Sequence, residues 1–453
     1  MGKIQNADSA KDIAFVLIKF SLPLILSGIL QQLYNWADAF IVGNVEGEAA
    51  LAAIGATTTV VNFYVTAVTG FTLGLSILFA QKFGSGDEKD ISEILATFSV
   101  SLGGIFAVLA AAGIAVTFPL LELLNTTEDT IFLAKEYLQL IFLGVPFLAV
   151  YNVYSAALRG IGDSKAPFYA VLLSSVVNII LDIVFVAYFH WGVSGAAIAT
   201  VISQSAMTVF LVTYGVKKYS ILRFKLCRES FNKKAFKVGC NFGIPPMLQS
   251  SVNSIGNIVL QNFMNRFGTQ TVAAITTAYR VDSIILVPMI NLGSGISTLV
   301  AQSIGSGQNK HARKILSVGA VIMSLISLLM TGLVIAAGGH LIALFGAGQE
   351  AIFIGDNFFH RIAVFYLIYG LSAAVRGYLE GTGDVLYSSF TGIAALCFRI
   401  FASYAFVSMF SNMVIAYAEG FSWIVLLLLY ILRLIWKEKT KRELKKPVSS
   451  QDD

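Results

Sequence analysis

Two aspartates interrupt otherwise apolar stretches of the sequence, and each belongs to a polar stripe with helical spacing. The first stripe follows the i, i+3, i+4, i+7 rule and comprises Gln31, Tyr34, Asn35 and Asp38. The second is spaced by four and comprises Ser174, Asn178 and Asp182. If these stretches cross a bilayer, a central carboxylate costs roughly 3 kcal/mol, so it should face a partner or a wet cavity. Carboxylate and carboxamide oxygens suit a hard cation, and neighbouring carboxylates also suit a shared proton.

Two further polar stripes contain no acid. One comprises Thr200, Ser203, Gln204 and Thr208. The other comprises Gln249, Asn253, Asn257 and Gln261. We expect the carboxylates, a carboxamide and hydroxyls from three helices to converge, and a substrate cavity to lie beside them. The candidate cavity residues are Gln31, Tyr34, Asn35, Gln204, Gln249, Asn253, Arg280 and Asp282.

The composition identifies the elements that carry these stripes as membrane helices. The chain has 453 residues, of which 56% are hydrophobic and only 13% are charged, and its mean hydropathy is +0.76. Soluble domains average about 25% charged residues, and disordered chains have low hydrophobicity, so both classes are excluded. The net charge of +5 does not indicate a nucleic-acid partner, because the basic residues do not form a polar surface domain. The fold class predicted is an all-α polytopic membrane protein.

Polar breaks divide the chain into twelve candidate spans, each near or above the roughly 20 apolar residues that cross a bilayer. They lie near 13–37, 50–80, 94–118, 132–157, 167–190, 193–216, 236–264, 277–303, 315–338, 356–379, 385–409 and 412–436.

The basic residues predict the orientation of these spans. They concentrate in the connection "KKYSILRFKLCRESFNKKAFK" (217–237), in the tail "KEKTKRELKK" and in the other loops of the same side. Since Lys and Arg mark the cytoplasmic side, we expect both termini inside a cell (plasma or inner) membrane.

An internal repeat relates the two halves of the chain. "AQKFGSG" (80–86) recurs as "AQSIGSG" (301–307), and "RGIGD" (159–163) recurs as "EGTGD" (380–384), with the same difference in residue number for both, which we call the repeat offset. The repeat predicts two parallel six-helix lobes. The expected units are an N-terminal lobe 1–216, a basic inter-lobe loop 217–237, a C-terminal lobe 238–436 and a cytoplasmic tail 437–453. The repeated glycines favour tight turns with positive φ.

The acid pair is not repeated. At the repeat offset, Asn178 and Asp182 correspond to Arg399 and Ser403. In the first span Pro23 corresponds to Pro245, one residue beyond the repeat offset, and Asp38 corresponds to Leu260 or Gln261. A purely structural role would more naturally be duplicated, so this asymmetry favours a functional role for the pair.

Other intramembrane residues leave alternatives open. Arg280 and Asp282 lie two apart and point to different helix faces, so each could line the cavity or pair with another helix. Arg376, Arg399 and Glu419 could pair across helices. Pro23 removes a backbone hydrogen bond early in the first span, which allows either relaxed packing or a hinge.

Patterns for catalysis or cofactor binding are missing from the sequence. It contains no GxxxxGK[ST], HExxH or GxSxG pattern, and Cys227, Cys240 and Cys397 are far apart. We therefore expect no enzyme activity, no cofactor, and no metal beyond a possible Na⁺ at the carboxylates.

Several segments resemble the multidrug and toxic compound extrusion (MATE) family. "QQLYNWADAFIVG" (31–43), which follows Pro23, resembles its first-span signature, and "RGIGDSKAP" (159–167), "NIILD" (178–182), "GTQTVAA" (268–274) and "AYRVDS" (278–283) fit bacterial members. The resemblance covers essentially the whole chain. It implies twelve helices in two lobes, and efflux of cationic or amphiphilic compounds in exchange for H⁺ or Na⁺.

The resemblance also implies a first-lobe cation site at Asp38, Asn178, Asp182 and Thr200. This set is closer to the DinF-like branch than to the NorM-like branch, which uses acids in the seventh and tenth spans. Here the seventh span has none and the tenth has only Glu380, at its edge. The implied cycle binds the ion at Asp38 and Asp182, bends the first helix near Pro23 and releases the drug.

Two rival functions and several partner assignments complete the expectations. One rival is a lipid-linked precursor flippase of the same superfamily, with a cationic cavity built from Arg280, Arg376 and Arg399. The other is a membrane enzyme or anchor. We expect a monomer whose partners are the lipid bilayer and small organic cations or amphiphiles.

Overall fold

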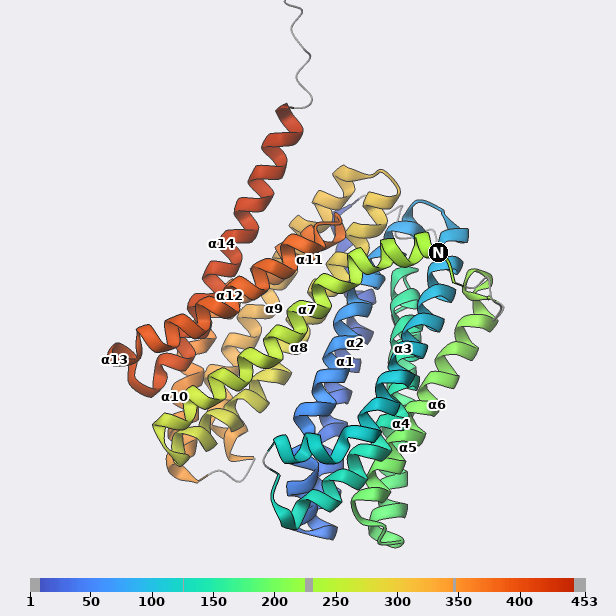
Figure 1. Ribbon diagram of the computed structural model, residues 1–453. Coiled ribbons are helices and arrows are strands. Elements are labelled where there is room, and N and C mark those ends of the chain that lie inside the picture. The colour runs from blue at the N-terminus through green and yellow to red at the C-terminus, as the bar shows by residue number, and fades with distance from the viewer. Residues whose placement is uncertain (1–8, 125, 225–230, 345–347, 444–453) are drawn as a thin grey trace, which may run out of the picture.

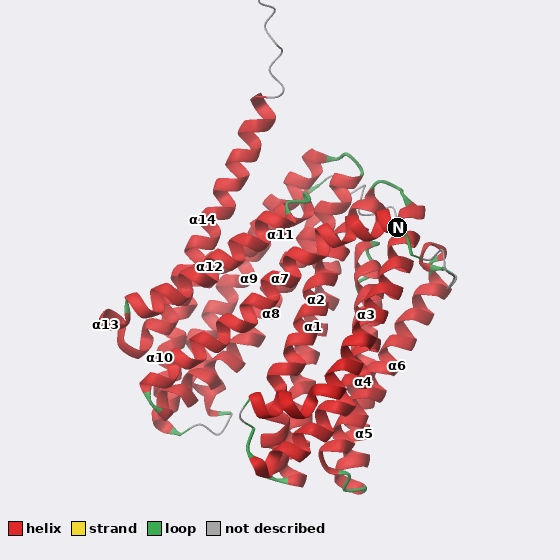
Figure 2. Ribbon diagram, in the orientation of Figure 1, coloured by secondary structure: helices red, strands yellow, loops and turns green. Residues whose placement is uncertain are grey.

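The computed structural model of the protein describes residues 9–124, 126–224, 231–344 and 348–443, while the side chains of Asn35, Ala39 and residues 441–443 lie outside this description. The described chain consists of helices joined by short loops, without a β-strand (Figures 1 and 2).

The first half of the chain forms six spans. They are α1 (Ala10–Glu46), α2 (Glu48–Gly84), α3 (Glu88–Leu123), α4 (Glu128–Gly160), α5 (Lys165–Asp182) extended by the π-helical η1 (Ile183–Tyr188), and α6 (Gly192–Lys218). The connection to the second half contains η2 (Ser220–Leu222).

The second half also forms six spans, several of them interrupted. They are α7 (Lys233–Met264) with η4 (Asn265–Phe267), α8 (Thr269–Gly305), α9 (Asn309–Ala343), α10 (Gln349–Ile362) continued through η5 (Ala363–Phe365) into α11 (Tyr366–Gly381), α12 (Val385–Ala405), and α14 (Val414–Glu443), preceded by α13 (Val407–Phe410) and η6 (Ser411–Met413). The predicted all-α fold is confirmed. The helices run past the predicted limits, so that α6 ends at Lys218, α7 begins at Lys233 and α14 continues to Glu443.

Eleven helices of the described chain are long and apolar enough to cross a membrane, and α7 is not among them. The reason lies in its sequence, because the stripe Gln249, Asn253, Asn257 and Gln261 lowers the hydropathy of an otherwise suitable helix of 32 residues. Its residues nevertheless cover the span predicted near 236–264, and with α7 the bundle has the twelve predicted spans.

The start of α1, the end of α6, the start of α7 and the end of α14 lie at one end of the bundle, which we call the basic end (Figure 1). The connections α2–α3, α4–α5, α8–α9 and α11–α12 share it, because each span reverses the chain. At this end four glycines adopt the positive φ that their turns need: 75° at Gly86, 93° at Gly162, 76° at Gly307 and 89° at Gly383. The expected tight turns are confirmed.

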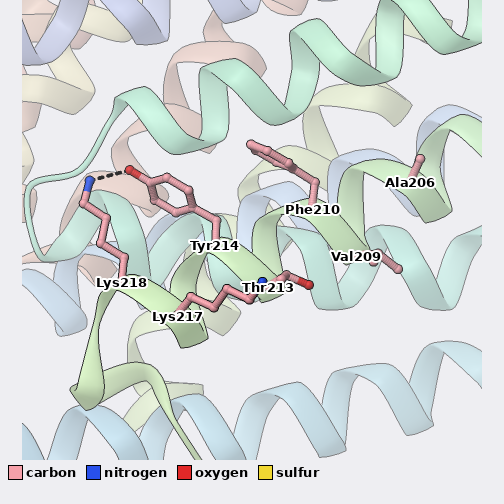
Figure 3. Close-up of a pocket in the computed structure, with 7 residues that line it drawn as sticks. All are labelled: Ala206, Val209, Phe210, Thr213, Tyr214, Lys217 and Lys218. Carbon is pink, nitrogen blue, oxygen red and sulfur yellow. Dashed lines mark hydrogen bonds between the residues drawn. The ribbon is translucent and has the colours of Figure 1, made fainter.

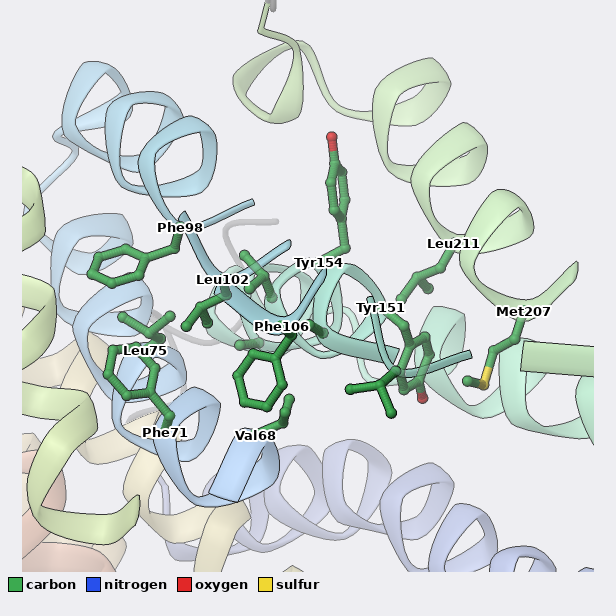
Figure 4. Close-up of a cluster of buried hydrophobic side chains, with 14 of the residues drawn as sticks. Val68, Phe71, Leu75, Phe98, Leu102, Phe106, Tyr151, Tyr154, Met207 and Leu211 are labelled. Carbon is green, nitrogen blue, oxygen red and sulfur yellow. The ribbon is translucent and has the colours of Figure 1, made fainter. Parts of the chain in front are cut away.

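The first-half core is a cluster of aliphatic and aromatic side chains from α2 to α6, and Figure 4 shows its part between α2, α3, α4 and α6. Phe71 and Phe98 belong to it, with ring centroids 5.5 Å apart. Phe236 of α7 stacks on Phe98 at 5.6 Å, although α7 belongs to the second half. In Figure 1, α7 accordingly starts beside the first half and runs diagonally to the second.

The first helix of the first half, α1, in turn packs against the second half. Its residues Ile13 and Leu17 are buried in the hydrophobic cluster of the second half, against α8 and α9. In each half, the start of the first helix thus packs against the hydrophobic core of the other half. The two lobes are interlocked at the basic end, which a linear division of the sequence does not convey.

Two repeat-related carboxylates anchor the turns at this end. Asp163 accepts hydrogen bonds from Tyr219 (2.7 Å), Tyr214 (3.0 Å) and Lys218 (3.1 Å), which ties the α4–α5 turn to the end of α6. Asp384 accepts two from Arg433 (2.7 and 3.1 Å), which ties the α11–α12 turn to α14. Partial burial acts to raise the pKa of both carboxyls, but these donors together lower each pKa below its usual value.

Candidate functional site

The first-half carboxylates predicted from the sequence meet inside the bundle. Asp38 lies on α1 and Asp182 at the end of α5, two helices that pack against each other, and their carboxyl groups are close enough to interact directly. Two ionised carboxylates repel at such range, so the approach is favourable only with a proton or a cation between them. The structure therefore brings together the two acids that the stripes singled out.

Asn178 shares the buried face of α5 with Asp182, one turn earlier, and both side chains are fully buried (0% exposed). Five polar atoms of this group find no hydrogen-bond partner of good geometry among the described residues: Oδ1 of Asp38, Oδ1 and Nδ2 of Asn178, and both carboxylate oxygens of Asp182. An unsatisfied buried polar group costs about 1–3 kcal/mol, and folded proteins rarely keep several in one place without a ligand. The cluster has the chemistry of a small-cation or proton site.

Two tyrosines complete the surroundings of the carboxylates. Tyr34 of α1 and Tyr137 of α4 both lie close enough to Asp38 and Asp182 to interact electrostatically with them. Tyr34 belongs to the predicted stripe. Tyr137 was missed, because a single tyrosine in an apolar span has no spacing signal and only the packed bundle places it here.

The backbone changes character next to Asp182. The α-helix stops there and η1 continues as a π-helix. Such widened turns are rare and recur at functional sites, since they shift the register of the side chains that follow. Residues 178–190 include no Pro or Gly, so this change has no local signal in the sequence.

Thr200 on α6 is buried, and its hydroxyl donates to the carbonyl of Ala196 at 3.0 Å. Its proton is therefore committed to its own helix, while its oxygen retains lone pairs for a ligand. The assignment of Thr200 to the site stays a prediction, since no described contact joins it to the carboxylates.

The candidate cavity residues occupy different places. Gln31 is exposed, Tyr34 and Asn253 are half-buried, and the side chain of Asn35 lies outside the described residues. Gln204 packs against Gly144 of α4, and Gln249 packs against Gly392 of α12, where it is only 7% exposed. Arg280 is exposed while Asp282 is buried, so the two side chains lie on different faces of α8, as expected. No described contact unites these residues into one cavity.

Hydrogen bonds and ion pairs engage four charged groups of the second-half spans with partners, in addition to Asp282. Arg399 of α12 pairs with Glu419 of α14 at 2.9 Å, and Tyr279 of α8 donates to Glu419 at 3.0 Å. Asp282 accepts a hydrogen bond from Tyr366, and Arg376 pairs with Glu380 at 2.6 Å within α11. The expected cross-helix pairing is confirmed for Arg399 and Glu419.

Pro23 lies inside α1, which continues unbroken around it, and the carbonyl of Lys19 loses its usual partner because proline has no N–H. The hydroxyl of Ser27 donates to the carbonyl of Pro23 at 2.9 Å. The hinge stays a prediction.

A groove of about 660 Å³ is formed elsewhere, along one face of α6 (Figure 3). None of the predicted site residues lines it. Among the described residues no group of three His, Cys, Asp or Glu side chains could hold a metal ion. The carboxylate cluster is therefore the candidate site.

A two-lobed helical bundle with an acidic cluster inside its membrane spans defines a class of protein, the polytopic membrane carriers. Comparison with known families narrows the class. The MatE family model matches residues 23–184 and 245–405, one match in each half of the chain. The chain therefore belongs to the MATE family, whose members are transporters and not enzymes.

Relatives and solved structures agree with this assignment. The chain is 29% identical to the probable multidrug resistance protein YpnP of Bacillus subtilis, over 82% of this chain and 83% of YpnP. It is 25% identical to the multidrug export protein MepA of Staphylococcus aureus, over 81% of each. Its fold matches the outward-facing structure of a multidrug resistance MATE family transporter with a TM-score of 0.88 at 22% identity, covering 98% of this chain and 99% of that one.

Proposed function

We propose that the protein is a secondary active exporter of cationic or amphiphilic compounds, driven by inward flow of H⁺ or Na⁺ through the Asp38–Asp182 site. The observation that carries the proposal is the close approach of the half-buried Asp38 and the buried Asp182, beside the unsatisfied amide of Asn178. The names of YpnP and MepA support drug export as the activity, and a site confined to the first half supports the DinF-like branch.

In this proposal the two lobes expose a central cavity alternately to each side of a cell membrane, with both chain ends in the cytoplasm. The ion binds from outside, neutralises the repulsion between Asp38 and Asp182, and draws α1 toward α5. The unpaired carbonyl before Pro23 is the weak point at which α1 bends. The bend alters the surface around Tyr34, the drug leaves, and the ion is then released inside.

The energy of one coupling ion is sufficient to export a neutral amphiphile, whereas exchange for a monovalent cation moves no net charge and draws on the ion's concentration gradient. Moving one charge through 100 mV yields about 2.3 kcal/mol, which corresponds to roughly 50-fold accumulation of a neutral substrate. The site holds two carboxylates, so it can remain occupied by one cation and still keep a negative charge for a second.

The flippase alternative loses much of its support. It requires a cationic cavity, yet Arg399 is neutralised by Glu419 and Arg376 by Glu380. Only Arg280 of the three arginines has no ion-pair partner among the described residues. A single arginine is a poor recognition site for a pyrophosphate.

The test is transport into liposomes by purified protein, driven first by an imposed pH gradient and then by an imposed Na⁺ gradient. Asp38→Asn should abolish uptake of a fluorescent organic cation under both gradients, while the variant elutes and melts like the wild type. Asn257→Ala, which changes a polar residue of α7, is the matched control and should keep most of the activity. Transport by Asp38→Asn at the wild-type rate would exclude the proposed site.

A further inference from the structure

The repeated segments "AQKFGSG" and "AQSIGSG" do more than turn the chain. Gln81, near the end of α2, donates its side-chain amide to the carbonyl of Gly381 at the end of α11, at 3.0 Å. Gln302, near the end of α8, donates in the same way to the carbonyl of Gly160 at the end of α4, at 2.7 Å. Both hydrogen bonds cross from one half to the other.

The two hydrogen bonds are related by the internal repeat. Gln81 and Gln302 are separated by the repeat offset, and so are their acceptors Gly160 and Gly381. The parallel repeat therefore makes the contact reciprocal, since each half supplies one donor and one acceptor. Two independent surface contacts would not be expected to share this offset.

The acceptors are carbonyls that their own helices leave without a partner. Gly160 and Gly381 are the last residues of α4 and α11, where the final carbonyls of a helix have no intrahelical donor. The opposite lobe supplies the missing donor. When the lobes separate at this end, which faces water in the proposed orientation, both groups can be hydrated, so each bond has a modest net value of about 1 kcal/mol.

Two glycines bring the helices close enough for these bonds. A Cβ atom on Gly84 would lie 2.1 Å from the carbonyl oxygen of Gln302, and one on Gly305 would lie 2.0 Å from the carbonyl oxygen of Gln81. These two glycines are again separated by the repeat offset. Any other residue at either position would force α2 and α8 apart.

The same symmetry continues along the interface toward mid-membrane. A Cβ on Gly74 of α2 would meet the carbonyl of Phe242 of α7 at 1.9 Å, and one on Gly295 of α8 would meet the hydroxyl of Ser21 of α1 at 2.2 Å. The two glycines, and likewise the two residues they face, are separated by the repeat offset. The described structure is therefore the state in which the basic end is closed.

We propose that Gln81 and Gln302, with Gly84 and Gly305, form a reciprocal latch that holds the basic end of the transporter closed and must open once in each cycle. The inference rests on the alternating access proposed above. Weak, hydratable bonds suit such a latch, because a strong closure would trap the protein in one state.

The test measures the distance between the lobes and not transport. Spin labels are placed on Cys residues introduced at Lys89 of α3 and Lys310 of α9, two exposed positions at the basic end, after replacement of the three native cysteines. Double electron–electron resonance then gives the populations of short and long distances in liposomes without substrate.

Gln81→Met and Gln302→Met keep the length of the side chain but remove the donor. Each should shift the ratio of closed to open molecules by about fivefold, and the double variant by roughly 25-fold. Gly84→Ala should open the basic end more than either, because backbone atoms cannot yield to the added methyl group. Gln308→Ala, at the same end but exposed, and Gly104→Ala, a helical glycine with open space around it, are the controls and should change nothing.

A distance distribution of the double methionine variant equal to that of the parent would overturn the latch. Should that variant fail to fold, the two single variants decide, and equal distributions in both would overturn it as well. Since the distances are measured without drug or ion gradient, the latch can fail while Asp38 still couples transport. It can equally hold if Asp38→Asn transports normally.

Discussion

The two halves of the molecule share one architecture and differ in how they treat buried charge. Repeat-related positions on α5 and α12 carry Asn178 in the first half and Arg399 in the second. The amide of Asn178 finds no partner among the described residues, whereas Arg399 is hydrogen-bonded to both Glu419 and Tyr279. Duplication preserved the scaffold, while the polar side chains diverged.

The difference teaches which half carries the chemistry. A charge network that satisfies itself, as around Arg399, needs nothing from solution and fixes the packing of α8, α12 and α14. A pair of carboxylates that face each other gains stability only from a bound proton or cation. Stability and function should therefore respond in opposite ways to mutations in the two halves.

The largest effect is expected from Glu419→Gln in the second half. The change removes the hydrogen-bonded counter-charge of the largely buried Arg399 guanidinium, which should destabilise the protein by about 3–5 kcal/mol. Thermal unfolding of the purified protein in detergent measures the loss. The double variant Arg399→Met/Glu419→Gln should recover much of it, because both charges are gone. Equal stability of Glu419→Gln and the wild type would refute the structural role of this pair.

Asp182→Asn should behave in the reverse manner. It removes one of two carboxylates that face each other inside the first half, so stability should stay equal or increase by about 1–3 kcal/mol while transport is lost. The same melting experiment, paired with the liposome assay, checks both parts. Ser403→Ala at the repeat-related position serves as the control and should transport normally. A large loss of stability in Asp182→Asn would assign the pair a structural role and remove the contrast between the halves.

Tyr279→Phe should have a smaller effect. The ring remains, packed on Phe358 at 5.3 Å, and only the hydroxyl that bridges Arg399 and Glu419 is removed. The ion pair itself persists, so we expect a loss of about 1–2 kcal/mol in stability and little change in transport. Tyr137→Phe in the first half should do the opposite and alter the pH dependence of transport with little change in melting. If both substitutions lowered the melting temperature equally, the proposed contrast between the two halves would be contradicted.

The smallest effect concerns the two turns at the basic end, where the halves should agree. The pKa values of Asp163 and Asp384 are lowered in the folded protein, so each contributes stability that is present above the unfolded value of about 3.9 and lost as the pH falls through the folded value. We expect Asp163→Asn and Asp384→Asn each to cost about 1 kcal/mol at pH 7 and to flatten the decrease of the melting temperature between about pH 5 and pH 3. An unchanged acid profile in either variant would contradict the role of that turn.

Much of the fold follows from the sequence because a membrane leaves few solutions. Backbone groups in lipid must be satisfied within helices, so apolar segments of sufficient length predict spans, and polar breaks predict their ends. The constant offset between the glycine motifs predicted the two halves, and the positive-φ turns at Gly162 and Gly383 follow from residue type. Asp38 and Asp182 stood out because a carboxylate in an apolar span is costly without a role.

Packing decided the rest, because contacts between distant segments have no signature in local spacing. The placement of Tyr137 beside the carboxylates, the π-helix after Asp182 and the exchange of α1 and α7 between lobes all depend on which helices meet. The same holds for Arg399 and Glu419, whose charges were readable but whose pairing was one of several alternatives. Gln81 and Gln302 looked like parts of a turn until the tertiary structure placed each against the last carbonyl of a helix in the other half. The sequence by itself determined the spans and the acids, since polar groups are costly in lipid, and it determined the repeat through a constant offset. Which side chains and helices contact one another was decided only by the packed bundle.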